Sequence, residues 1–330
     1  MTRRSFLHWG LGVGLLCGLD RLAGATEASA LQWASRTLNG LGTTLRLRAA
    51  HSDSTRAAAA LDAAVADIRH LEGLMSLFRP DSQIQQLNRD GMLRHPHADV
   101  LEVLRIAQKV SQQSQGAFDV TVQPLWQVFE AARVRGELPH AADVTAARAH
   151  IGWQRMAISA DSITLAPGMG VTLNGIAQGY IADRVRARLL QHGVAHALVD
   201  TGEFAPLGLP EAGRDWTLGL AHPRHADAVL GRLAMRGLCM ATSADDQCAF
   251  SADHRHHHIF DPRTGYSPPD IASVTVLAPS CVMADALTKV IFMAGFDRAL
   301  TVAQRWGVQA VVLSKQSQLR LTPGLKLLQA

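Results

Sequence analysis

Helical and strand-like apolar patterns follow one another in this chain without strict alternation, and that order constrains the fold more than any other feature. Apolar residues recur at helical spacing over 61–75, behind a candidate cap at Asp53 or Ser54, and over 100–110; a third helix is expected over 176–190. Short or alternating apolar runs predict strands at 44–48, 155–159, 197–199, 216–220, 273–277 and 310–313. We therefore expect an α+β fold with mainly antiparallel sheets and flanking helices, not a doubly wound parallel sheet.

Composition excludes several classes of protein. The chain has 330 residues, of which 48% are hydrophobic and 18% charged, so it holds enough apolar material for a core and is not a disordered chain. Its formal net charge is +4, and no run of five basic residues occurs, so we expect no nucleic-acid partner. No repeat or linker divides residues 26–330, which we interpret as one folded unit.

The first 25 residues resemble an export signal. The pair Arg3 and Arg4 precedes a glycine-rich apolar stretch at 9–19, and small residues at 23–25 match a cleavage site. Paired arginines indicate the twin-arginine class, which a transporter reads as an address. The apolar stretch is well short of the roughly 20 residues that a membrane helix needs, so no stable membrane span is expected. The sequence thus predicts a signal peptide at 1–25 and a mature periplasmic domain at 26–330.

Three cysteines remain after this signal: Cys239, Cys248 and Cys281. They contain no Cys-x-x-Cys pair for zinc or thiol exchange, and three are too few for a disulfide framework. A Cys239–Cys248 bridge and small buried thiols are both compatible with the spacing.

Four glycines, at 168, 170, 175 and 179, surround the start of the third expected helix. Glycine lets a backbone approach a ligand closely, and amides at a helix N-terminus attract phosphate. The same pattern also fits an ordinary turn from strand to helix with a packing glycine. A fourth segment, 111–125, reads as a helix end, a glycine stop and a short strand bearing Asp119.

Two later segments carry further polar chemistry. Residues 254–266 join a histidine cluster to an Asp-Pro-Arg-Thr-Gly turn, which could move protons or hold a structural metal between His256 and His258. Residues 281–295 predict a helix with Asp285 and Lys289 four residues apart. Such a pair is commonly an exposed ion pair of roughly 0.2–0.5 kcal/mol, but the helix is almost wholly apolar, which favours a pair that lines a site.

These four segments together resemble the FAD:protein FMN transferase family, also called the ApbE family. Further matching blocks follow in the family's order and bring the resemblance to about residues 42–295: Met75-Ser76, Arg79-Pro80-Asp81-Ser82, Leu87-Asn88 and Leu198-Val199-Asp200-Thr201-Gly202. The resemblance implies a two-lobed enzyme that binds FAD as substrate and, with Mg²⁺, transfers FMN to a Thr or Ser hydroxyl of an acceptor flavoprotein. AMP is the product that leaves.

The resemblance also implies roles for individual residues. His258 would handle the proton of the acceptor hydroxyl. The carbonyl of Ala177 and the carboxylate of Asp285 would bind the metal, with Thr288 as an alternative further ligand. Residues near the flavin nucleotide would be Met75, Ala117, Phe118, Asp119, Asp183, Ile259 and Lys289.

Some positions depart from the family pattern. Gln178 stands where the family usually has Lys, Thr172 where it has Asp, and Lys289 where it has a metal-binding Thr. The glycine expected after Ser243 is missing. An ammonium group cannot ligate Mg²⁺, so Lys289 is expected to lie against the diphosphate as a point charge, unless the metal shifts to Thr288. Two alternative functions therefore stay open: a flavin-binding accessory or maturation protein without transfer activity, and an FAD pyrophosphatase.

Overall fold

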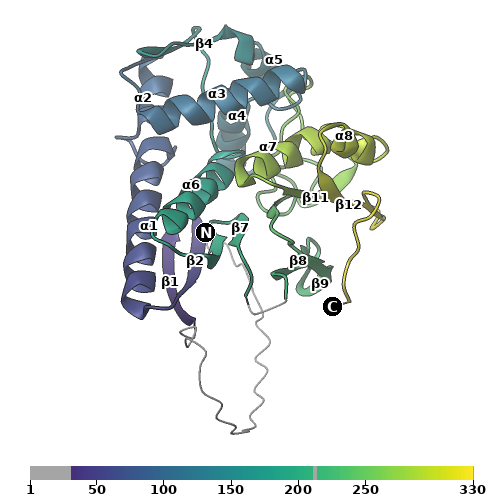
Figure 1. Cartoon of the computed structure of the whole chain (residues 1–330). Coiled ribbons are helices and arrows are strands. Elements are labelled where there is room, and N and C mark those ends of the chain that lie inside the picture. The colour runs from purple at the N-terminus through teal and green to yellow at the C-terminus, as the bar shows by residue number, and fades with distance from the viewer. Residues whose placement is uncertain (1–30, 211–213, 330) are drawn as a thin grey trace, which may run out of the picture.

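An antiparallel sheet of eight strands forms the centre of the protein (Figure 1). The computed structural model describes residues 31–210 and 214–329, so the expected signal peptide lies outside the described residues. The strand order is β1-β2-β6-β7-β10-β11-β12-β13, and every neighbouring pair is antiparallel. This confirms the expected fold class. The strands are β1 Gln32–Gly40, β2 Thr43–His51, β6 His196–Asp200, β7 Phe204–Leu207, β10 Cys239–Ala244, β11 Ile271–Ala278, β12 Gln309–Ser314 and β13 Leu319–Leu321.

Four helices pack on one face of this sheet: α1 Ser54–Met75, α6 Ala177–Gln191, α7 Cys281–Phe292 and α8 Ala299–Arg305. Their apolar sides and the facing strand residues form the main core, which includes Leu47, Ile68 and Ile291. All eight residues of β11 are buried, because helices cover one of its faces and other elements cover the second. Strand β11 therefore sits in the interior of the protein.

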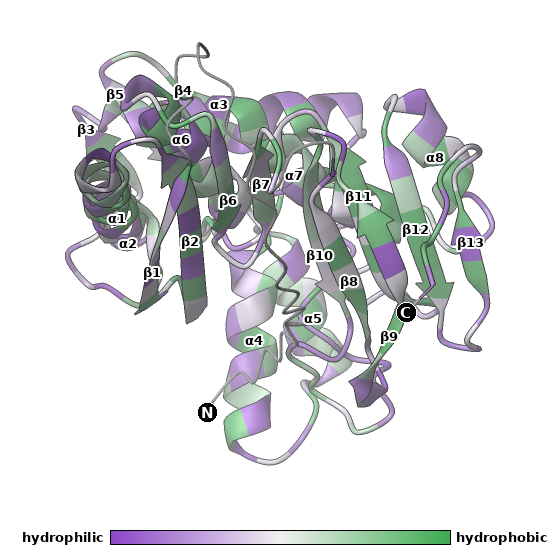
Figure 2. Ribbon diagram, turned by 60° about the horizontal axis from the view of Figure 1, so that its bottom comes forward, coloured by the Kyte–Doolittle hydropathy of each residue, from purple (hydrophilic) through white to green (hydrophobic). Residues whose placement is uncertain are grey.

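The other face of the sheet is covered by a hairpin of β8 Thr217–His222 and β9 His225–Ala234, which lies in front of the sheet in Figure 2. Trp216, Leu218 and Leu233 of this region bury apolar surface against Met240 and Leu277 of the sheet. The hairpin thus closes a second, smaller core.

A mainly helical part forms the second lobe, at the top of Figure 1. It carries a three-stranded sheet in the order β3-β5-β4. Some of its buried residues, such as Leu104, join the main core, whereas Leu125, Phe129 and Val144 pack with Phe260 in a separate cluster. Its elements are α2 Gln83–Asp90, β3 Met92–Arg94, α3 Ala98–Gln113, α4 Gln123–Val134, α5 Ala141–Arg148, the 3₁₀ turn Trp153–Arg155, β4 Met156–Ile158 and β5 Ser162–Leu165.

The local signals of the sequence mostly hold. Asp53 caps α1, since its Oδ1 accepts from the amide of Thr55 at 2.8 Å. All six expected strands and the expected helices are present. The short strand expected at Asp119 is wrong: this residue has no regular secondary structure, Val122 forms only an isolated bridge with Gly170, and α4 begins at Gln123.

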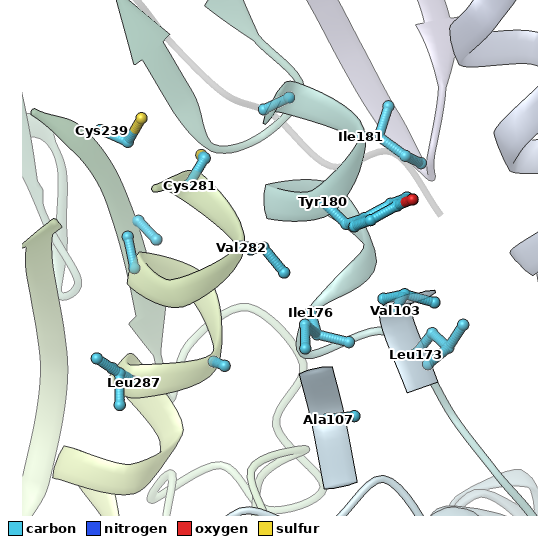
Figure 3. Packing of buried hydrophobic residues seen from close by; sticks show 14 of the residues in the cluster. Val103, Ala107, Leu173, Ile176, Tyr180, Ile181, Cys239, Cys281, Val282 and Leu287 are labelled. Carbon is cyan, nitrogen blue, oxygen red and sulfur yellow. The ribbon is translucent and has the colours of Figure 1, made fainter. Parts of the chain in front are cut away.

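Two further expectations concern cysteines and membranes. No disulfide forms among the three cysteines of the described residues, so the Cys239–Cys248 bridge is absent; Cys239 instead lies beside Cys281 (Figure 3). In the described part of the chain, no helix has the length and apolarity to cross a bilayer.

Candidate active site

Helices α6 and α7 touch at Gly179, and this contact builds the site. A Cβ atom on Gly179 would lie only 2.4 Å from the carbonyl oxygen of Cys281, so the close approach requires glycine. The Gly179 amide donates to Oδ2 of Asp285 at 3.1 Å. Figure 3 shows the two helices side by side at this level, with Tyr180 on α6 and Val282 on α7. The packing interpretation of this glycine is therefore confirmed, and its amide is already bonded to a carboxylate.

Asp285 and Lys289 form a buried ion pair. The side chain of Asp285 is 1% exposed and that of Lys289 is 18% exposed. The Lys289 ammonium donates to Oδ1 of Asp285 and, at 3.1 Å, to the Asp285 carbonyl oxygen. An exposed pair on a solvated helix face is thus ruled out, as the apolar surroundings in the sequence suggested.

The stem of Lys289 lies against the turn that precedes α6. A Cβ atom on Gly175 would lie 3.2 Å from Cε of Lys289 and 3.6 Å from the ring of Phe118. The structure therefore brings together three of the expected segments: the turn at Phe118, the glycine turn before α6, and the charged pair of α7. Ala177 is the first residue of α6 and lies two positions after Gly175.

Glu203, directly before β7, adds a buried carboxyl that sequence reasoning missed. It accepts from the amide of Thr242 at 3.1 Å. Burial, and next the charge of Asp285, raise the pKa of Glu203 well above its usual range, while Lys289 opposes this shift. The ammonium of Lys289 is therefore the cation of a small acidic cluster.

The hydroxyl of Thr288 is bonded to protein groups and is not placed to bind a metal ion. It donates to the Asp285 carbonyl oxygen at 2.6 Å, and the Ser243 hydroxyl lies 2.7 Å from it. Thr288 is fully buried between α7 and β10. Both of its polar contacts are protein groups, which differs from the ligand role considered from the sequence.

Asp183, which is expected beside the nucleotide, has protein partners for its carboxylate. Its carboxylate accepts from the hydroxyl of Ser280 at 2.9 Å and from the amides of Cys281 and Val282 at 3.0 and 2.9 Å. These amides belong to the first turn of α7, which has no intrahelical partners for them. Asp183 thus caps α7 and fixes it to α6.

Asp119 is likewise bound by its own surroundings. Its carboxylate accepts from the amide and hydroxyl of Thr121 at 2.8 and 2.7 Å and from the Trp153 amide at 3.0 Å. Burial raises the pKa of Asp119, and these bonds oppose the shift. Its neighbours Phe118, which is buried, and Ala117, which is partly buried, pack on the main core, as does Met75 at the end of α1.

The histidine segment forms a compact loop. His257 is fully buried, and its ring lies 3.4 Å from the Pro268 carbonyl and 3.3 Å from the Ile259 amide. The amide of His258 donates to the Cys248 carbonyl at 3.0 Å, and Ile259 is buried in the core. The histidines of this segment do not form a metal site with three or more ligands: the described residues contain no group of three or more metal-binding side chains placed for an ion.

The turn after this loop uses its own polar groups. Asp261 accepts from Nε and Nη2 of Arg263 at 2.8 and 2.7 Å, and its carbonyl accepts from the Gly265 amide at 2.8 Å. The Arg263 guanidinium also reaches the carbonyl of Met293, just after α7. The carboxylate and guanidinium of this turn therefore fix the loop of His258 to the end of α7.

Gln178, which replaces the family's usual Lys, lies in the first turn of α6 and contacts the central sheet. Its side-chain amide donates to the Leu41 carbonyl at 3.4 Å, and its main-chain carbonyl accepts from Thr201 at 3.0 Å. A Cβ atom on Gly202 would collide with it at 2.6 Å. Gln178 is therefore packed tightly against the Asp200–Gly202 turn.

An open cleft of about 370 Å³ lies next to the glycine turn. Asn174, directly before Gly175, forms part of its wall, and the aromatic residues Phe78 and Trp126 form another part. Phe78 is 80% exposed, which is unusual for a large apolar side chain. Sequence reasoning missed both aromatics, although Phe78 follows the matching Met75-Ser76 block. The remaining lining residues are Leu77, Gln123, Gln127, Glu130, Ala131 and Val134.

Comparison with known proteins agrees with this arrangement. A model of the ApbE family matches residues 41–312, which is most of the chain. The chain belongs to the ApbE family. A relative from Klebsiella pneumoniae (strain 342), named FAD:protein FMN transferase, is 31% identical over 266 residues, which cover 77% of this chain and 82% of the relative. A relative of the same name from Haemophilus influenzae is 30% identical and covers 72% and 73%.

Solved structures of ApbE proteins have the same fold. The apo form of the flavinyl transferase ApbE from Pseudomonas stutzeri has a TM-score of 0.78 at 28% identity, over 89% of this chain and 95% of that one. The ApbE protein from Thermotoga maritima has a TM-score of 0.81 at 24% identity, over 88% and 97%. The two-lobed α+β fold of this ApbE-family chain is therefore that of its relatives.

The residues of this family member do not fit the Mg²⁺ that the resemblance implies. Both carboxylate oxygens of Asp285 are bonded, one to the Lys289 ammonium and the other to the Gly179 amide. The Thr288 hydroxyl is bonded elsewhere. Magnesium prefers six oxygen ligands in octahedral geometry, and a fixed cation on its main carboxylate opposes its binding.

Proposed function

We propose that this chain is an FAD:protein FMN transferase, which moves FMN from FAD to a Thr or Ser hydroxyl of an acceptor flavoprotein and releases AMP. Membership of the ApbE family and the names of the relatives support this activity. The observation that carries it is the approach of Phe118 and Lys289 to Gly175, because the preceding residue, Asn174, lines the aromatic cleft. This arrangement offers apolar surface for a ring system and a cation for a phosphate within one site.

In this proposal the bonds change as follows. The acceptor oxygen attacks the phosphorus on the FMN side of the diphosphate, and the bond to the AMP phosphate breaks. The proton of the hydroxyl passes to His258. The amide of His258 is bonded to the Cys248 carbonyl, and Arg263 of the following turn is bonded to the Met293 carbonyl just after α7. A positioned base typically contributes about 10²- to 10⁴-fold to the rate. Lys289 stabilises the negative charge of the diphosphate.

The proposal does not include the magnesium that the resemblance implies. The contacts of Asp285 and Thr288 argue against a site for it, and no step above uses a metal.

The test is covalent flavin transfer in a purified system. The protein is incubated with FAD and a small flavoprotein domain that carries a target Thr, and in-gel flavin fluorescence is measured after denaturation. A Thr→Ala version of that domain is the matched control and should stay unlabelled. Free FMN and AMP without labelled protein would indicate a pyrophosphatase, and intact bound FAD would indicate an accessory protein; either result would contradict the proposal.

We also propose that the protein is exported to the periplasm through the twin-arginine route. The support is the sequence of residues 1–25 alone, with its paired Arg3 and Arg4. Replacing both arginines with Lys should retain the protein in the cytoplasm, as measured by fractionation. Normal export of this double variant would argue for a general secretory signal.

A further inference from the structure

The metal requirement of this site depends on what Asp285 binds. Its Oδ2 accepts from the Gly179 amide at 3.1 Å, and its Oδ1 and its own carbonyl both accept from the Lys289 ammonium. Asp285 is 1% exposed, so solvent contributes little to its environment. Each oxygen of the carboxylate thus has a partner within the protein.

Lys289 is held in this position along its whole side chain. Its Cε lies 3.2 Å from the place of a Cβ on Gly175, and the ring of Phe118 lies on the same side. The ammonium is anchored at two oxygens of one residue. This is a fixed charge, unlike the ammonium of an exposed lysine, which samples many rotamers.

A divalent ion on Asp285 would have to displace this ammonium or lie beside it. Repulsion between two cations a few ångströms apart is strong in a buried site. The Thr288 hydroxyl, the other oxygen considered as a metal ligand, is bonded to Ser243 and to the Asp285 carbonyl. The described residues contain no group of three or more His, Cys, Asp or Glu side chains placed to hold a metal ion.

We infer that Lys289 is the permanent cation of this site and takes the place of a divalent metal ion, so that the chain binds a flavin diphosphate without Mg²⁺. The inference rests on the proposed function for the identity of the ligand. Lys289 lies beside the glycine turn that precedes α6. Lysine is suited to this task because it acts as a compact point charge on phosphate.

The first test measures metal binding without FAD. Mn²⁺ replaces Mg²⁺ as the probe, and electron paramagnetic resonance counts the free ion at millimolar total concentration. The wild type should bind no stoichiometric Mn²⁺. Lys289→Thr should gain one site, and adding Asp285→Asn to that variant should remove it. One tightly bound Mn²⁺ in the wild type would overturn the inference.

The second test measures FAD affinity by flavin fluorescence, with Mg²⁺ and with EDTA. The wild type should bind equally in both, whereas Lys289→Gln should bind at least tenfold more weakly in EDTA. Lys289→Arg keeps the charge and should retain binding. Lys109→Met, an exposed lysine on α3, is the matched control and should change nothing. Thermal melting checks that each variant is folded.

The outcomes separate the two proposals. If the wild type binds FAD only with Mg²⁺, the inference about Lys289 is wrong while the transferase proposal stands. If the wild type binds no FAD under any condition, the transferase proposal fails. The Mn²⁺ measurement still decides whether Lys289 excludes a divalent ion.

Discussion

Gly179→Ala should destabilise the protein, although the same change usually stabilises a helix. Alanine in place of glycine favours a helix by about 1 kcal/mol. Here the new Cβ would lie 2.4 Å from the Cys281 carbonyl oxygen and 2.8 Å from Cβ of Asp285, so α6 and α7 must separate. Overpacking typically costs about 1–3 kcal/mol, and contact with rigid backbone places this site at the upper end. The expected net loss is about 2 kcal/mol, or roughly 4–8 °C in Tm.

Gly73→Ala in α1 is the matched control, because nothing lies within 4 Å of the new Cβ. It should raise the free energy of unfolding by up to about 1 kcal/mol. Both variants and the wild type are compared by thermal melting and by urea denaturation. If Gly179→Ala were as stable as Gly73→Ala, the tight crossing of α6 and α7 would be refuted.

Three other predictions follow from buried polar groups. Burial lowers the pKa of His257 to about 3. The free energy of unfolding should therefore be constant above pH 6.5 and fall below it, by about 2 kcal/mol at pH 5. Urea denaturation at several pH values measures this dependence, which the His257→Gln variant should lose. Asp183→Ala removes the carboxylate that caps α7, and it should lower the free energy of unfolding by about 1–2 kcal/mol in thermal melts. The affinity for FAD should stay within twofold of wild type. An unchanged Tm with weaker FAD binding would instead support a nucleotide contact. The buried carboxylate of Asp245 binds the Arg224 guanidinium at 2.6 and 2.7 Å and the Lys315 ammonium. Asp245→Ala leaves both cations without this partner and should lower the free energy of unfolding by about 3–5 kcal/mol in the same melts. A loss under 1 kcal/mol would contradict this prediction.

The elements that the sequence predicted have strong local patterns. Helix α1 has a side-chain cap at Asp53 and a regular buried stripe. Strand β10 was missed because its residues, Cys239–Ala244, are small or weakly apolar and five of the six are buried, so no alternation is visible. Helix α5 was missed for a similar reason, since only Val144 and Ala147 are buried.

The site could be predicted only in part, because its contacts are distant in sequence. The four-residue spacing predicts that Asp285 and Lys289 meet, but their burial depends on β7, β10 and the glycine turn. Glu203 meets Thr242, 39 residues away, and no local pattern marks it. The carboxylate of Asp183 binds the start of a helix 98 residues later, and no local pattern marks this contact either.

The strand order of the central sheet has a consequence for how the chain folds. Strand β2 pairs on one side with β1 and on the other with β6. Its second edge therefore stays unpaired during folding until residues 196–200 add to the sheet. Pairing between such distant segments slows folding, because a long loop must close before any contact rewards it. Until then the β1–β2 hairpin has an open edge, and Leu45 and Leu47 lack their final cover. A chain cut before His196 should therefore aggregate through this edge, even though its helices could form.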